Sequence, residues 1–159
     1  MNLIKSNDKS VPFGVAITLA LIGFFFSMQP LGLVHNLMLR ALNGIFMFAG
    51  VFLAVRQHRK NTPAESFRSL NGLSVGLRTA MFAAIAFATF VSLYLLMDEA
   101  FMAQVKANEP QGQYMNPFTV SIVIFVEAMA SGSLFAYISM QYFKVNNQVK
   151  ADAKEVYSN

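Results

Sequence analysis

The chain of 159 residues contains no cysteine and no tryptophan, and it has few charged residues. The absence of cysteine excludes disulfide bonds, thiolate metal sites and thiol nucleophiles. Charged residues make up 13% of the sequence and hydrophobic residues 55%, and this charged fraction is about half that of a typical soluble domain. A soluble protein of this size could not hide so much apolar surface, so we expect the excess to face lipid.

Four apolar stretches are long enough, at about 20 residues, to cross a bilayer as helices. Gln29-Pro30-Leu31-Gly32 joins the first two as an antiparallel hairpin, because Pro and Gly interrupt a helix where water can satisfy the backbone. Asn116 and Pro117 have the residue types of a helix cap and a first helical position, and they predict the start of the last stretch. The sequence therefore predicts an all-α, four-helix antiparallel bundle with spans at residues 11–28, 33–55, 78–97 and 117–143.

The basic residues are divided unevenly between the two sides of such a bundle. One side has only Lys106, with Arg40 just inside its membrane face. Cytoplasmic loops carry an excess of Lys and Arg, so the other side, with both termini, is predicted to be cytoplasmic. This distribution explains the net charge of +4 without nucleic-acid binding. The basic residues of the cytoplasmic side are Lys5, Lys9, Arg56, Arg59, Lys60, Arg68, Arg78, Lys144, Lys150 and Lys154.

The connections are less regular than the spans. Residues 56–77 are predicted to be a basic cytoplasmic loop with an amphipathic turn, and Thr62, Pro63 and Glu65 have the residue types of a capped helix start. The pattern does not decide whether residues 63–77 form a separate interfacial helix or continue into the third span. An extension of the third helix is one possibility for the first half of residues 98–116, and residues 144–159 are expected to be a polar, frayed or disordered tail.

Small residues recur at four-residue spacing in the third and fourth spans. Helices in lipid associate by close packing, so such residues mark contact faces. We therefore expect spans three and four to pack closely, although alanine is also simply common in membrane helices. The predicted helix-packing residues are Gly76, Ala80, Ala84, Ala88 and Ser92 in the third span, and Ala128, Gly132 and Ala136 in the fourth.

Arg40 and Glu127 are charged residues inside predicted spans, where a charge costs about 2.5 to 3.5 kcal/mol. Asn36 and Asn43 share the face of Arg40 at helical spacing, and Ser131 shares the face of Glu127. A buried Arg40–Glu127 pair supported by these polar residues is the working hypothesis. The pair can serve only to fix helix register, or it can form a titrating or binding site. In the third alternative the two do not pair, and Arg40 reaches outward toward Asp98 or Glu99.

The sequence carries no motif for catalysis or for a cofactor. His35 and His58 fall on opposite sides of the membrane, so they cannot share a metal. Ser131-Gly132-Ser133 resembles an intramembrane serine nucleophile, but no membrane-embedded His is available as its base. Phe24, Phe25 and Phe26 surround a helix end and are expected to face mostly lipid. We therefore predict no enzyme, no metal and no cofactor.

Four spans, a charged cytoplasmic loop, Ser66-Phe67 before Gly72 and Gly76, and Asn116-Pro117 before the last span resemble an uncharacterised family. It consists of small four-span bacterial membrane proteins known as a domain of unknown function. The resemblance covers most of the chain, and it implies an inner-membrane location and no assigned activity. Small multidrug transporters also have four spans and a membrane-embedded Glu, but theirs lies in the first span, so the chain is not assigned to them.

These features predict a multi-pass membrane protein without enzymatic activity. It would lie in the lipid bilayer and assemble with itself or with a larger complex through its small-residue helix faces. The alternative is a small proton-coupled transporter or channel subunit that uses Glu127.

Overall fold

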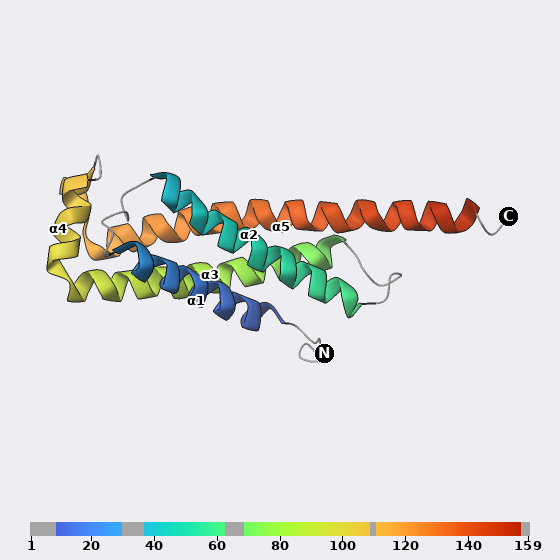
Figure 1. The fold of residues 1–159 in the computed structure, drawn as a ribbon, viewed down its shortest axis with the longest axis horizontal. Helices are drawn as coiled ribbons and strands as arrows, with labels where there is room; N and C mark the ends of the chain where they lie inside the picture. The colour runs from blue at the N-terminus through green and yellow to red at the C-terminus, as the bar shows by residue number, and fades with distance from the viewer. Residues whose placement is uncertain (1–8, 30–36, 63–68, 109–110, 157–159) are drawn as a thin grey trace.

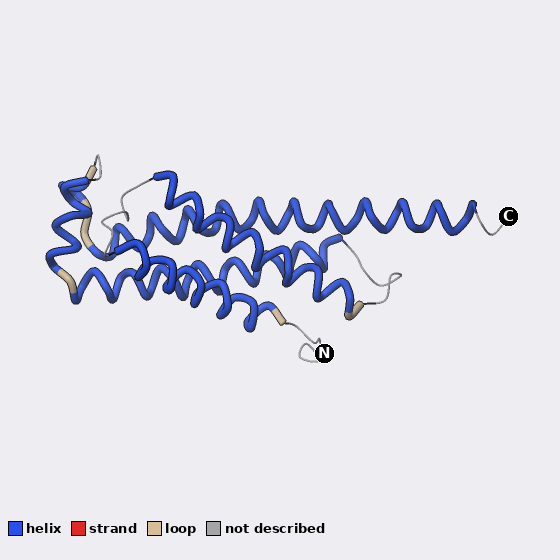
Figure 2. Tube along the Cα trace, in the orientation of Figure 1, coloured by secondary structure: helices blue, strands red, loops and turns tan. Residues whose placement is uncertain are grey.

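The computed structural model describes residues 9–29, 37–62, 69–108 and 111–156, without the side chains of residues 37–41, 69 and 145–156. Within these ranges all regular structure is helical, as Figure 2 shows, so the all-α prediction is confirmed. The elements in Figure 1 are α1 (Ser10–Met28), α2 (Leu37–Lys60), α3 (Ser69–Met97), α4 (Glu99–Asn108), the short 3₁₀ helix η3 (Gly112–Tyr114) and α5 (Pro117–Val156).

Three of these helices have the length and apolar composition needed to cross a membrane: Ser10–Met28, Leu70–Met97 and Pro117–Lys144. They contain the first, third and fourth predicted spans, which supports the membrane prediction. α2 contacts α1, α3 and α5, and the four long helices lie side by side (Figure 1). α2 contains residues 37–55 of the predicted second span, and residues 33–36 lie outside the described part.

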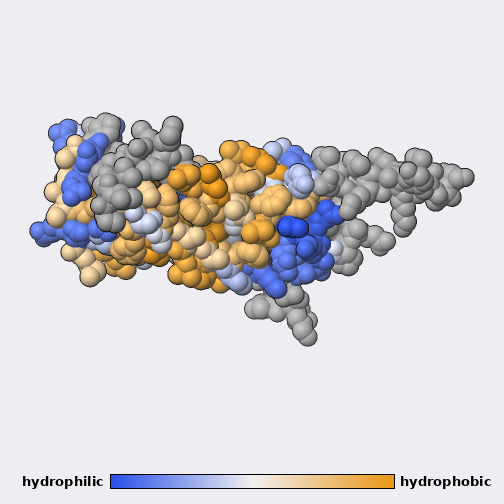
Figure 3. Space-filling model, in the orientation of Figure 1, coloured by the Kyte–Doolittle hydropathy of each residue, from blue (hydrophilic) through white to orange (hydrophobic). Residues whose placement is uncertain are grey.

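The packing of these helices has an apolar interior and an apolar exterior. Val51 and Val55 of α2 and Ala80 of α3 are fully buried, whereas Leu19 and Val126 are exposed by 64% and 58%. Figure 3 shows, on the face in view, an apolar band across the middle of the molecule and hydrophilic surface toward both ends. Such a band is the surface that lipid requires, because exposed apolar side chains have no cost there.

The basic segment 56–60 differs from the prediction, because it is helical. Arg56, Arg59 and Lys60 belong to the last turns of α2, where cations interact favourably with the partial negative charge of a helix C-terminus. The Thr62 hydroxyl donates to the His58 carbonyl at 2.9 Å and closes this helix. Residues 69–77 are continuous with α3, so this part of the amphipathic segment is no separate helix, and residues 63–68 lie outside the described part.

The connection after α3 does not extend that helix, which the sequence had left as one possibility. The chain bends at Asp98, and α4 turns across the end of the long helices instead of extending α3 (Figure 1). The reason is a helix cap, because the Phe101 N–H donates to Asp98 Oδ1 at 2.8 Å. We call this end of the molecule the α4 end.

α5 begins where the sequence predicts and ends later. The Thr119 N–H donates to Asn116 Oδ1 at 2.8 Å, which confirms the predicted cap. The helix then runs through Val156, so residues 144–156 are helical where we expected a frayed or disordered tail. Extending an existing helix needs no new nucleation, which explains why a polar segment can continue it.

Candidate functional site

Glu127 lies on an exposed side of α5, far from both ends of the candidate span Pro117–Lys144. Ten residues separate it from Pro117, which is about 15 Å along the helix axis. Gly132, which contacts α3, lies five residues later, so Glu127 is rotated by roughly 140° from that contact. The structure therefore leaves Glu127 at the surface of the chain, where the sequence analysis expected a buried residue.

Exposed residues accompany Glu127 along α5 at helical spacing. Leu134 is exposed by 56%, and its neighbours on this side are aliphatic or small. Because the residues recur every three or four positions, they form one continuous surface along the helix. We call this surface the Glu127 face: Val123, Glu127, Ala130, Leu134 and Ile138.

The polar group predicted around Glu127 is only partly described. Asn36 and the side chain of Arg40 lie outside the described part, so their pairing with Glu127 stays a prediction. Asn43 is half-buried on α2. The Ser131 hydroxyl donates to the backbone carbonyls of Glu127 and Ala128 at 2.9 and 3.2 Å, so it satisfies the helix backbone of α5.

The small residues predicted for helix packing lie where α3 meets α5. A Cβ atom added to Gly132 would lie 2.5 Å from the Cβ of Ala80, and one added to Gly76 would lie 2.7 Å from the Cβ of Ala136. Real Cβ atoms do not approach so closely, so only glycine allows this contact. Ala84 and Ala88 are also buried, whereas Ser92 and Ala128 are half-buried. We call Gly76, Ala80, Gly132 and Ala136 the α3–α5 seam.

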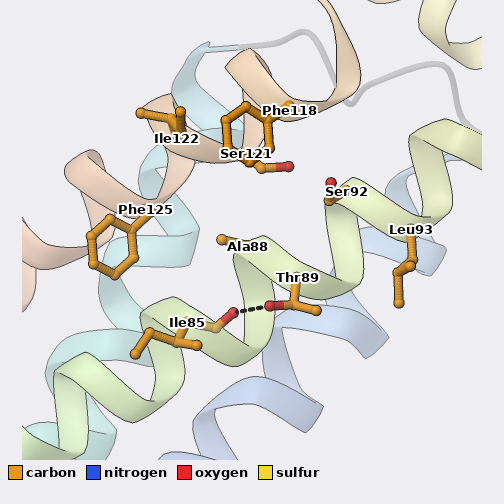
Figure 4. A pocket seen from close by; sticks show the side chains of 9 residues that line it. All are labelled: Ile85, Ala88, Thr89, Ser92, Leu93, Phe118, Ser121, Ile122 and Phe125. Atoms are coloured by element: carbon orange, nitrogen blue, oxygen red, sulfur yellow. Dashed lines mark hydrogen bonds between the residues drawn. The ribbon is translucent and has the colours of Figure 1, made fainter.

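An open groove of about 300 Å³ follows this seam toward the α4 end. Figure 4 shows its lining from both helices, with Ala88 between them. Two of its hydroxyls bond to their own helix, Thr89 to the Ile85 carbonyl at 2.8 Å and Ser121 to the Pro117 carbonyl at 2.8 Å. The lining of the groove is therefore mainly apolar. Hydropathy does not predict this groove, because it does not show where two helices leave a gap.

A chain of side-chain hydrogen bonds joins three helices at the α4 end. Gln29 Nε2 donates to the Tyr94 hydroxyl oxygen, and the Tyr94 hydroxyl donates to Asp98 Oδ2 at 3.1 Å. The other carboxylate oxygen of Asp98 caps α4 at Phe101. No function was predicted for these residues, although Asp98 lies three residues before Phe101, which is the spacing of a helix cap.

Phe25 belongs to an aromatic cluster beside this chain, so the expectation that it faces mostly lipid is wrong. Its ring centroid lies 5.1 Å from Tyr94, 5.6 Å from Phe101 and 5.8 Å from Phe90, at steep interplanar angles. Edge-to-face contacts of this kind add about 0.5 to 1.5 kcal/mol per pair beyond area burial. The cluster fixes α4 against the ends of α1 and α3.

No group of three or more His, Asp or Glu residues that could hold a metal occurs in the part of the chain that the structure describes. Comparisons with models of protein families, with curated proteins and with solved structures find no match for the chain.

Proposed function

We propose that the chain is a four-span integral membrane protein with both termini in the cytoplasm. α2 would be the second span, since it packs against all three candidate spans. Arg59 of α2 contacts Phe143 of α5, which brings the basic end of α2 level with Lys144, while Lys106 lies on α4 at the opposite end. The positive-inside rule then gives the orientation, and the family resemblance implies the inner membrane of a bacterium.

Single-cysteine variants test this topology without background, because the chain has no cysteine. Lys106→Cys should react with a membrane-impermeant maleimide in intact cells, and Lys60→Cys only after the membrane is opened. Both residues are exposed, so a difference in labelling reports the side of the membrane. The reverse pattern, or equal labelling of both variants in intact cells, would contradict the topology.

In this topology the chain serves as a non-enzymatic assembly subunit, and the Glu127 face is its interface. The exposure of Glu127 on a membrane-crossing helix carries the proposal. A carboxylate at this depth costs about 2.5 to 3.5 kcal/mol in contact with lipid. A protein partner on this face removes the contact between the Glu127 carboxylate and lipid. This holds whatever groups of its own chain Glu127 also contacts. The partner is a second copy or another membrane subunit.

The interface assigned here differs from the one that the small residues suggested. Gly132 and Ala136 already pack against Ala80 and Gly76 inside the chain. A second molecule can use the α3–α5 seam only if it first separates these helices. Assembly therefore requires another surface, and the Glu127 face adds a polar group to exposed aliphatic residues.

The test is the size of the complex that a mild detergent extracts from the membrane. Leu134→Trp places a bulky ring on the Glu127 face and should reduce the complex to a single chain. Leu19→Trp is the matched control, because Leu19 is an exposed leucine of a candidate span on α1, and it should leave the complex intact. A wild-type protein that already runs as a single chain, or equal behaviour of the two variants, would refute the interface.

A proton-coupled transporter or channel subunit is the second candidate, and the same exposure of Glu127 favours it. An exposed carboxyl group can exchange protons if water reaches it, and membrane-embedded acids commonly serve this purpose. Dicyclohexylcarbodiimide labels protonated carboxyl groups in lipid. Transport predicts labelling of Glu127 in the intact assembly that decreases as the pH rises. Assembly predicts labelling only after Leu134→Trp has uncovered the face.

A further inference from the structure

Basic side chains gather at the end of the bundle where α1 begins and α2 ends. Ile17 of α1 packs at Gly50 of the antiparallel α2. Lys9 lies eight residues before Ile17 and His58 eight residues after Gly50, so the two lie at the same level. Lys144 joins this level, since Arg59 bonds to the residue before it. We call Lys9, Arg56, Arg59, Lys60 and Lys144 the basic ring.

One cation of the basic ring is held in place, and the others are exposed. Arg59 Nη1 donates to the Phe143 carbonyl at 3.1 Å, and its guanidinium carbon lies 5.9 Å from the centre of the Phe143 ring. Phe143 itself is only 8% exposed. Arg56, Lys60 and Lys144 are exposed, so they remain available to a ligand outside the chain.

Arg78 extends the positive surface from α3. It lies two residues beyond Gly76 toward the middle of the helix, and its Nη2 donates to Ser74 Oγ at 3.2 Å. Ser74 is four residues back toward the basic ring, so the exposed guanidinium is directed to that end. Long cationic side chains commonly extend toward the membrane surface in this way.

Among the side chains that the structure describes, all charged groups around the basic ring are positive. The described acidic side chains are Asp98 and Glu99 at the α4 end and Glu127 on α5. Exposed apolar residues border the ring on its membrane side, with Leu53 one turn before Arg56 and Tyr142 beside Lys144. A ligand of this surface must therefore carry both negative charge and an apolar part. An anionic lipid has both, whereas a nucleic acid has no apolar tail.

From these contacts we infer that the basic ring binds the phosphate head groups of anionic lipids in the cytoplasmic leaflet. Each Lys or Arg near an anionic surface increases the affinity about fivefold. Arg59 is fixed against Phe143 and lowers the entropic cost of binding, and Arg56 and Lys60 supply mobile charges on the same helix. The inference rests on the proposed topology for the identity of the leaflet.

The test compares lipid binding by the purified full chain and two variants in a zwitterionic detergent. Dioleoyl-phosphatidylglycerol and dioleoyl-phosphatidylcholine are titrated, and retained lipid is counted by native mass spectrometry. Wild type should prefer phosphatidylglycerol, and the double variant Arg56→Gln, Lys60→Gln should bind it about thirtyfold more weakly. Lys106→Gln, which removes an exposed cation at the α4 end, should keep the wild-type preference.

A charge-preserving variant separates loss of charge from loss of folding. Arg56→Lys with Lys60→Arg should retain the preference for phosphatidylglycerol. Equal affinity of wild type for the two lipids would overturn the inference. An equal loss of phosphatidylglycerol binding in Lys106→Gln and in the double variant would also overturn it. So would stabilisation of the protein by free inorganic phosphate as large as that by phosphatidylglycerol. The cysteine labelling of Lys60 and Lys106 reports the topology separately, so a failure of orientation and a failure of lipid binding give different results.

Discussion

The α3–α5 seam makes a quantitative prediction at Gly132. A methyl group there would lie 2.5 Å from the Ala80 Cβ, whereas ordinary contact begins at 3.4 Å. Gly132→Ala therefore forces the two helices apart by almost 1 Å or bends them. Overpacking of this kind costs about 1 to 3 kcal/mol. The substitution also gains up to about 1 kcal/mol of helix propensity, so the cost must be measured against a matched glycine.

Gly23 of α1 is the matched control, because a Cβ atom added there meets nothing within 4 Å. Gly23→Ala should be neutral or stabilising, and Gly132→Ala should be less stable than Gly23→Ala by about 1 to 3 kcal/mol. The assay is unfolding of the purified protein by sodium dodecyl sulfate in mixed micelles, followed by circular dichroism. Equal free energies of unfolding for the two variants would refute the seam.

The seam also predicts which clash can be rescued. Ala80→Gly removes the atom that meets the new methyl group, and the next contacts, at 3.7 and 3.9 Å, are ordinary. The double variant Gly132→Ala, Ala80→Gly should therefore recover most of the lost stability. Rescue of Gly76→Ala by Ala136→Gly should be incomplete, because the Ala136 Cα at 3.1 Å and Val55 at 3.3 Å remain. Full rescue at both sites, or at neither, would contradict this geometry.

Substitutions of Asp98, Asn116 and Arg59 test three individual contacts, each beside a comparison variant. Asp98→Ala should lower the stability of α4 by about 0.5 to 2 kcal/mol and speed hydrogen exchange at the Phe101 amide, because it removes the cap; Asp98→Asn should retain part of it. Asn116→Ala should have a similar cost at the start of α5, measured by thermal unfolding, and Asn116→Asp should not. Arg59→Gln should cost about 1 kcal/mol by losing the bond to the Phe143 carbonyl, whereas exposed Lys60→Gln should stay within about 0.5 kcal/mol.

Features that depend on composition alone could be predicted from the sequence. Apolar length identified α1, α3 and α5 as candidate spans, because lipid tolerates apolar surface on every side of a helix. The cap at Asn116 was also predictable, since capping requires only a local side chain. The small residues of the seam were visible as a four-residue spacing, because close approach leaves no room for larger side chains.

Features that depend on the third dimension could not be predicted in the same way. Helical spacing shows that Glu127 and Ser131 are near each other, but not whether their side of α5 faces another helix. The bend at Asp98 competes with simple continuation of α3, and the aromatic contacts of Phe25 with Tyr94 and Phe101 stabilise the bent form. These contacts join residues distant in the sequence, so a reading of α3 alone does not find them.

The most direct test of the assembly proposal is photo-cross-linking in living cells. A p-benzoylphenylalanine residue replaces Leu134 on the Glu127 face or, as the control, Leu19 on α1. Assembly through this face predicts a discrete protein adduct from position 134 that decreases when Glu127→Leu is added, and no such adduct from position 19. Lipid adducts alone from both positions, or the same protein adduct from both, would contradict the proposal.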